Sequence, residues 1–532
     1  MSALFIHHAQ LLSFQQGFPA HQDSLVVEDG RIKAIGRFEE LKSLLESGME
    51  MLDAGGKTIL PGFNDSHIHI WKLGNLKTFM LDLRGVGSLD HMLSLLSDFH
   101  QDFPDLTWIM ARGFNEAGWK PSRMPTKEDL DKVTRDKPMY VIHTSAHTAV
   151  ANSKALELAS VHAETRVPPG GEMQIGMDGK PNGVFSETAL GLVANSIPAY
   201  SKKELKTMVL AAREEMYRYG ITAATDPAVD PLLMEVYQEM NRNQELGFRL
   251  NAMAILLPDG SENPYPIPEY HSSSFLRMNT VKFFSDGGLS SHTAALKRPY
   301  KNSQDRGILR LKKSQYLDLC RQSMAKGLGI ATHAIGDAAI DLVIDVYKEL
   351  HRDFPELIKR IEHLGLPSEQ NLKDMSDHQI AASMQSIFIH ELGRNFIKYL
   401  DEEYLSRCYP VKSALDQGIL TALSSDAPVV QDFNPLKGAE SAVTRLDRDG
   451  NRIAPGEAIT ISQALKAYTL DAARIGGIED AGKLAIGDLA DLVLLGQNPL
   501  HVTADQLSGI NVEKTLVGGR VVYDRAAENS KA

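Results

Sequence analysis

Residues 58–70 read TILPGFNDSHIHI, an apolar run that ends in two histidines separated by one residue. A short apolar run of this kind predicts a buried β-strand. Residues i and i+2 of a strand point to the same face, so His67 and His69 would present both imidazoles to one metal ion. Isolated pairs of histidines also occur at surfaces and in cores. The rest of the chain therefore has to decide what this pair does.

Seven further apolar runs follow, with helical patterns between them. They are 221–228 (ITAATDPA), 248–256 (FRLNAMAIL), 279–287 (NTVKFFSDG), 329–337 (GIATHAIGD), 360–366 (RIEHLGL), 379–386 (QIAASMQS) and 420–429 (LTALSSDAPV). Short strands that alternate with longer helices indicate βα units around a parallel sheet. Eight strands suit a closed barrel better than an open sheet. We therefore predict an α/β fold with a (β/α)₈ TIM-like barrel over residues 56–479.

Two regions depart from this pattern. Residues 71–220 are too many for one crossover helix, so we expect an inserted subdomain over the barrel mouth, with its own strand in 138–150 (PMYVIHTSAHTAV). Residues 1–55 and 480–525 both contain short β-type runs with DG or GG turns. We expect these two ends to pair into one small β-sandwich domain. Two unrelated edge hairpins are the alternative.

Polar residues recur at the carboxyl ends of the predicted strands, where barrel enzymes carry their chemistry. His333 ends the fifth strand, His363 the sixth and Asp426 the eighth. Each residue alone says little. Together with the first strand, however, four separate strands bring metal-preferring side chains to one end of the barrel, and this convergence predicts a metal centre.

Lys282 lies within the apolar run VKFFSDGG of the predicted fourth strand. A lysine inside a barrel is unfavourable unless it is neutralised or paired. Burial lowers its pKa and makes the neutral amine nucleophilic, so that it can take up carbon dioxide and form an anionic carbamate that bridges two metals. The alternatives are a lysine that faces outward or one that pairs with Asp286.

The composition narrows the function further. Of 532 residues, 43% are hydrophobic and 23% are charged, as in ordinary globular proteins, and the net charge of −12 disfavours nucleic acid as a partner. No apolar stretch approaches the ~20 residues that span a bilayer, and His7 and His8 interrupt the apolar N-terminus, which does not read as a signal peptide. Two cysteines, Cys320 and Cys408, are too few for a disulfide framework or a thiolate cluster. We expect a cytoplasmic enzyme with a small-molecule substrate and no nucleic acid or membrane partner, and we leave a homodimer open.

In order and spacing, the motifs PGFNDSHIHI, VKFFSDGG, THAIGD, RIEHLG and SSDAPV resemble the metal motifs of the amidohydrolase superfamily. The chain looks most similar to the branch that contains N-substituted formamide deformylase. The resemblance covers nearly the whole chain, including residues 482–495 (GKLAIGDLADLVLL), which are similar to the return of that family into its β-sandwich. It implies a metal-dependent hydrolase that acts on carbon–nitrogen bonds other than peptide bonds.

The resemblance also implies roles for individual residues. His67, His69 and Asp426 would hold the more buried of two divalent ions, with zinc as the expected metal, while His333 and His363 would hold the outer one. Lys282, as a carbamate, would bridge them. A metal-activated hydroxide would attack an N-formyl, N-acyl or cyclic amide, with Asp426 carrying the proton.

The substrate side is implied less completely. The residues that the resemblance suggests there are His147, Asn152, Arg112 and Gln385. Ala146 stands where the family has glycine, and Ser386 stands where it has proline, so the matches around His147 and Gln385 are partial. Arg112 lies in ARGFNEAGWKP of the insert and is expected to line the pocket.

Two other functions stay open. One is a mononuclear deaminase of the same superfamily that acts on a ring amine. Such members typically carry a glutamate after the fifth-strand histidine and lack the lysine, whereas Ala334 follows His333 here and Lys282 is present. The other is a non-catalytic scaffold that has lost its metals, but all six ligand positions are filled in this chain.

Overall fold

The computed structural model describes residues 3–19, 21–45, 47–258, 261 and 263–530. The chain forms two compact units, one of residues 1–70 and 213–532 and one of residues 71–212. The first unit contains the barrel and the sheets built from the chain ends. The second is the insertion that follows the first barrel strand, as the sequence predicts.

Eight parallel strands form the barrel, and each of the eight predicted runs overlaps one of them. In spatial order they are β7 (Phe63–Asp65), β14 (Ile221–Val229), β15 (Arg249–Ile255), β17 (Leu276–Phe284), β18 (Gly329–Ala334), β19 (Lys359–His363), β20 (Ile380–Met384) and β21 (Thr421–Leu423). The first and last strands meet just beyond their ends. There the N–H of Asp426 donates to the carbonyl of His67 at 2.8 Å, and the N–H of His69 donates to that of Ala427 at 2.9 Å.

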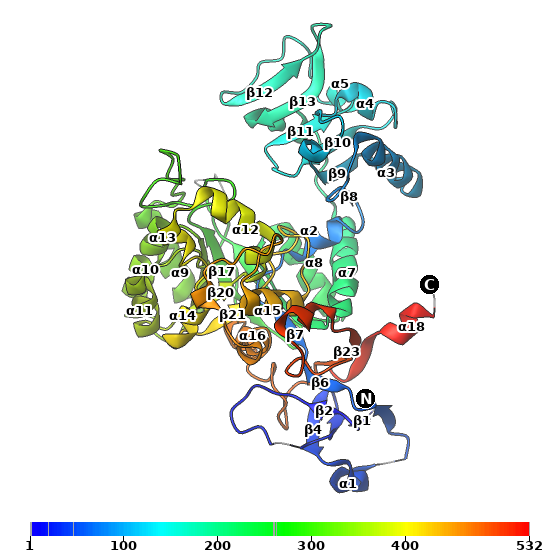
Figure 1. Cartoon of the computed structure of the whole chain (residues 1–532), viewed down its shortest axis with the longest axis vertical. Helices are drawn as coiled ribbons and strands as arrows, with labels where there is room; N and C mark the ends of the chain where they lie inside the picture. The colour runs from blue at the N-terminus through cyan, green and yellow to red at the C-terminus, as the bar shows by residue number, and fades with distance from the viewer. Residues whose placement is uncertain (1–2, 20, 46, 259–260, 262, 531–532) are drawn as a thin grey trace. The chain divides into compact units, whose positions relative to one another are not determined.

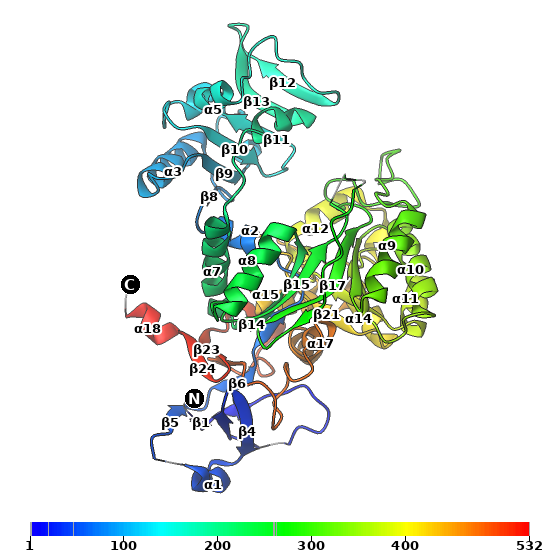
Figure 2. The same cartoon turned by 180° about the vertical axis from the view of Figure 1, so that it is seen from behind.

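Helices cover the outside of this sheet, which explains why its strands read as continuous apolar runs. In Figure 1, α9 (Lys313–Ala325), α10 (Asp337–His351) and α11 (Glu369–Asp377) lie outside the strands, and Figure 2 shows α8 (Pro231–Arg242) beside β14 and β15 from behind. The helix α10 buries Ile340, Val343, Ile344 and Tyr347 on one face, the spacing of an amphipathic helix.

Strands from both chain ends share one sheet, which confirms the predicted β-sandwich. Its order is β2 (Gln10–Leu11), β6 (Thr58–Pro61), β22 (Leu492–Leu495), β23 (Val512–Val517) and β24 (Arg520–Asp524). A second sheet contains β1 (Leu4–His7), β3 (Ser24–Glu28), β4 (Arg31–Gly36) and β5 (Glu50–Asp53). Ile6, Leu25, Ile59, Leu492 and Leu516 belong to one buried apolar cluster that joins the two ends of the chain.

The inserted unit has its own mixed sheet. Its strands are β8 (Met80–Asp82), β9 (Ile109–Phe114), β10 (Met139–His143), β11 (Thr148–Ala151), β12 (Gly171–Ile175) and β13 (Pro181–Glu187). The single strand predicted over 138–150 is wrong, because β10 lies inside that range and its antiparallel partner β11 begins there, at Thr148. A turn at residues 144–147, with Ala146 at φ 61°, reverses the chain between them.

The two cysteines and the lengths of the helices complete the description of the fold. Cys320 and Cys408 are both free and buried, as inert structural thiols are. Among the helices described, none is both long enough and apolar enough to cross a bilayer.

Candidate metal centre

Six predicted ligands come together at the carboxyl ends of the barrel strands. They are His67, His69, Lys282, His333, His363 and Asp426. The Nε2 atoms of His67 and His69 lie 3.5 and 3.2 Å from Oδ1 of Asp426. The ring of His363 has its centroid 4.9 Å from that of His67 and 4.4 Å from that of His333.

The prediction that His67 and His69 lie on one face of a strand is wrong. The strand β7 ends at Asp65, so His67 and His69 follow it and do not share a strand face. Oδ1 of Asp65 accepts the N–H of His67 at 3.1 Å, a local turn that leads the chain out of the strand. The same oxygen accepts the N–H of Ser425 at 3.1 Å, which holds the Asp426 loop beside the histidines.

The group of His67, His69 and Asp426 fits a divalent cation. A tetrahedral ion with ligand bonds of about 2.05 Å separates its ligand atoms by about 3.3 Å, and the two distances to Oδ1 of Asp426 lie on either side of that value. This oxygen is buried and, among the described residues, has no hydrogen-bond donor of acceptable geometry. Each of the three residues offers one ligand atom, and these atoms all lie within 4.8 Å of one another, which suits a shared cation.

Each of three imidazoles has one ring nitrogen held by an oxygen acceptor. Nδ1 of His67 lies 2.5 Å from Oε2 of Glu362, and Nδ1 of His363 lies 2.6 Å from Oε1 of Gln385. Nε2 of His333 lies 3.2 Å from the carbonyl of Gly287. A nitrogen that donates to an oxygen carries the hydrogen, so the other nitrogen of that ring keeps a lone pair for a metal.

Lys282 points into the barrel. It is fully buried, its Nζ has no hydrogen-bond partner in the described part of the chain, and this atom lies 4.8 Å from the ring centroid of Phe284. Burial lowers the pKa of Lys282 to about 8, although the charges of Glu362 and Asp426 act in the opposite direction. Both alternatives for Lys282 are therefore wrong. Asp286 instead accepts the backbone N–H groups of Ala295, Ile335 and Gly336.

Comparisons with known proteins identify the family. The sequence pattern described as "Amidohydrolase family" matches residues 50–523. The chain belongs to the amidohydrolase family. The chain is 28% identical over 515 residues to the putative amidohydrolase YtcJ of Bacillus subtilis, a match that covers 95% of this chain and 96% of that protein.

The chain is also similar to a second curated protein and to a solved structure. It is 28% identical over 525 residues to the N-substituted formamide deformylase of Arthrobacter pascens, covering 94% of this chain and 95% of that protein. The crystal structure of an uncharacterized metal-dependent hydrolase from Pyrococcus horikoshii superimposes with a TM-score of 0.80 at 24% identity, covering 95% of this chain and 100% of that one. The latter shows that the two proteins share a fold.

Arg360 and Glu362 form a buried ion pair next to the candidate ligand His67, and the sequence analysis did not predict it. Glu362 is fully buried, and Arg360 donates to it from Nε at 2.5 Å and from Nη2 at 3.0 Å. Burial alone would raise the pKa of Glu362, but Arg360 and His67 hold it well below its usual range. A signal was present, since Arg360 and Glu362 are opposite charges two residues apart on one face of an apolar strand.

Gln385 stands next to the ligands and not at a free surface of the site. Its Oε1 accepts from His363, and its Nε2 donates to Oγ of Ser424 at 2.9 Å. The side chain is fully buried. These contacts make Gln385 a residue that orients His363, and its predicted contact with substrate stays a prediction.

The other three residues that are predicted to bind substrate belong to the inserted unit. Asn152 is buried and caps α5 (Ser153–Leu158) by accepting the N–H of Ala155, while its Nδ2 donates to two backbone carbonyls. The exposed His147 pairs with Glu187 at 3.0 Å. Arg112 lies on β9, where burial and then the charge of Arg84 lower its pKa. Their role toward substrate stays a prediction.

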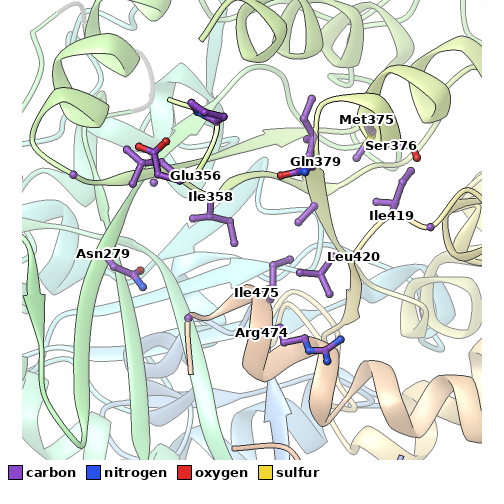
Figure 3. A pocket seen from close by; sticks show the side chains of 18 of the residues that line it. Asn279, Glu356, Ile358, Met375, Ser376, Gln379, Ile419, Leu420, Arg474 and Ile475 are labelled. Carbon is purple, nitrogen blue, oxygen red and sulfur yellow. The ribbon is translucent and has the colours of Figure 1, made fainter. Parts of the chain in front are cut away.

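A pocket of about 510 Å³ lies at the other end of the barrel strands (Figure 3). Ile358, Gln379 and Leu420 line it, and each immediately precedes β19, β20 or β21. These are the amino ends of strands whose carboxyl ends carry the candidate ligands. Barrel enzymes carry their active sites at the carboxyl ends of the barrel strands, so this pocket is not the candidate active site.

Proposed function

We propose that this protein hydrolyses a carbon–nitrogen bond of a small amide-like substrate, an N-formyl or N-acyl amide or a cyclic amide, at a centre of two zinc-class ions. The observation that carries the proposal is the convergence of His67 and His69 on a buried oxygen of Asp426 that has no hydrogen-bond partner among the residues that the structure describes. The similarity to a formamide deformylase supports the choice of bond.

In this proposal His67, His69 and Asp426 hold one ion, and His333 and His363 hold the other. Divalent ions at this place supply Lewis acidity, which polarises an amide carbonyl and makes an attacking water more acidic. The acceptors behind the imidazoles, Glu362 and Gln385 among them, keep the ligand nitrogens pointing into the site.

Asp426 carries the proton. Burial alone would raise its pKa, but the adjacent imidazoles of His67 and His69 hold it well below its usual range, so the group is a carboxylate at neutral pH. Its second oxygen accepts a proton from the attacking water and then gives it to the nitrogen of the leaving amine as the carbon–nitrogen bond breaks. Water is thereby divided between a carboxylic acid and an amine.

Lys282 is proposed to carry a carbamate, formed when its neutral amine adds to carbon dioxide and releases one proton. Two observations support this: Nζ is buried without a hydrogen-bond partner in the described part of the chain, and the pKa of Lys282 is lowered. A free ammonium would repel two nearby cations, whereas the carbamate supplies an anion that offsets their mutual repulsion.

The test uses full-length protein stripped with a chelator and reloaded with zinc, assayed on formyl, acetyl and cyclic amides with ring amines beside them. We expect amide hydrolysis that the chelator abolishes and zinc restores. Asp426→Asn should lower kcat roughly 10²–10⁴-fold, while binding of a substrate analogue survives better. A fully active metal-free protein would contradict the proposal, and ammonia release from a ring amine by a one-ion enzyme would favour the deaminase.

A further inference from the structure

A second group of metal-preferring side chains lies in the terminal β-sandwich. Nδ1 of His7 is 3.0 Å from Nδ1 of His8, and the latter atom is 3.2 Å from Oδ1 of Asp53. Nδ1 of His7 is 3.9 Å from the same oxygen. None of these three residues belongs to the candidate metal centre, whose ligands lie in the barrel.

The fold brings the three side chains together from two strands. β1 pairs in parallel with β5, and the register sets His7 directly beside Asp53. His8 follows β1, and in a continued strand its side chain would point to the opposite face from that of His7. Instead, His8 adopts a left-handed conformation with φ 52°, and its imidazole meets that of His7.

Neighbouring groups hold this arrangement in place. The ring of Phe38 has its centroid 5.3 Å from that of His7 and 5.5 Å from that of His8. The N–H of Gly55 donates to Oδ1 of Asp53 at 2.9 Å. Side chains that are already ordered lose less conformational freedom when they bind a ligand, so preorganisation of this kind favours binding.

We propose that His7, His8 and Asp53 form a second site for a transition-metal ion of the zinc class. Ligand atoms around a tetrahedral ion lie about 3.3 Å apart, and the separations of the three atoms, 3.0, 3.2 and 3.9 Å, lie on either side of that value. The two imidazoles favour zinc, copper or nickel ions, because magnesium and calcium prefer sites made of oxygen ligands. Water takes the remaining position.

The two imidazoles give a further reason. Nδ1 of His8 lies within hydrogen-bonding distance of both Nδ1 of His7 and Oδ1 of Asp53, so one hydrogen on it serves only one of these contacts well, whereas a cation would contact all three atoms. The ion would join the end of β1 to the end of β5. Because it binds the folded sandwich and not the unfolded chain, it should raise the melting temperature of the protein.

The test compares ion binding by full-length proteins. Chelator-treated wild type, His8→Asn and Asp53→Asn are titrated with Zn²⁺ by calorimetry, and bound zinc is counted by elemental analysis. The His8 and Asp53 side chains are 54% and 59% exposed, and asparagine tolerates a positive φ, so both variants should fold. Each should bind one ion fewer per chain than wild type, keep its hydrolytic activity and lose part of the zinc-dependent rise in Tm.

Two controls make the result specific. His21→Asn changes another exposed histidine with a positive φ, 67°, outside the cluster, and should bind zinc as the wild type does. Asp426→Asn should weaken binding at the barrel centre and leave the sandwich ion in place. If His8→Asn and Asp53→Asn bind as many ions as wild type with the same affinity, the sandwich site does not exist.

Discussion

Gln385 illustrates how a side chain beside a metal ligand can determine the state of that ligand. Its Oε1 accepts from Nδ1 of His363, which leaves the lone pair on Nε2. Glu362 has the same relation to His67. These two acceptors distinguish the ligand nitrogens from the nitrogens that carry hydrogen, so each ring offers one defined atom to an ion.

The role of Gln385 can be separated from substrate binding. Gln385→Leu removes the acceptor and should lower metal affinity about 10–100-fold, the usual effect of losing a partner of this kind. Gln385→Glu keeps an acceptor oxygen and should retain most of the affinity. The measurement is competition for zinc with a chromophoric chelator. A raised KM with unchanged metal affinity would instead make Gln385 a substrate-binding residue.

The variant Lys282→Ala tests the proposed bridging carbamate. Lys282→Ala should lose metal and activity together, because the bridging anion is gone. Acetate or propionate should restore part of both by placing a carboxylate in the vacated space, and bicarbonate should improve metal loading of the wild type. Elemental analysis with and without the acid measures this. Normal binding of two ions by Lys282→Ala without added acid would rule out the carbamate.

At the scale of elements, the turn from β18 into α10 holds His333 in position. The carboxylate of Asp286 accepts the N–H groups of Ile335 and Gly336, which places the start of the helix. Gly336 packs so closely on Ala295 that a Cβ atom there would lie 2.0 Å from the carbonyl oxygen of Ala295. The turn therefore has no room for a side chain.

Gly336→Ala should accordingly destabilise the protein by about 1–3 kcal/mol, as overpacking typically does, and should weaken metal binding through His333. Denaturant unfolding and zinc titration measure the two effects. Gly456→Ala is the matched control, since a Cβ there meets nothing within 4 Å and no positive φ opposes it. Equal stability of the two variants would show that the turn can give way.

The two ends of the chain contribute to the stability of the fold, although they lie away from the candidate metal centre. β22 lies between β6 and β23, so the C-terminal residues complete a sheet that the N-terminal residues begin. Asp491, just before β22, accepts from the buried Arg249 of β15 at 2.9 and 3.0 Å. The sandwich is thus bound both to itself and to the barrel.

Removing residues 481–532 should therefore destabilise the whole protein and cause aggregation, because it exposes the edge of β6 and leaves Arg249 buried without its partner. Removing only residues 525–532, which form the exposed α18 (Arg525–Asn529) and the last residues of the chain, should be tolerated. Soluble yield and thermal unfolding compare the two. A soluble and active 1–480 fragment would contradict this account.

The barrel, the pairing of the chain ends and the grouping of the candidate ligands could all be predicted from the pattern of residues. Alternating apolar runs and helices imply a parallel barrel, and such a barrel brings the carboxyl ends of all its strands to one rim. Residues as distant as His67, Lys282 and Asp426 could therefore be assigned to one cluster without coordinates. The error over 138–150 came from treating a continuous β-type composition as one strand, although residues 144–147 turn the chain back.

Only the tertiary structure decided which atoms meet. Glu362 reaches His67 across 295 residues of chain, and His7 meets Asp53 through the register of two strands. His363 and Asp426 also have positive φ values, 76° and 58°, which aim their side chains in directions that strand periodicity does not describe. Register, left-handed backbone conformations and contacts between distant segments depend on the packing of the whole fold, and a local pattern of residues does not encode them.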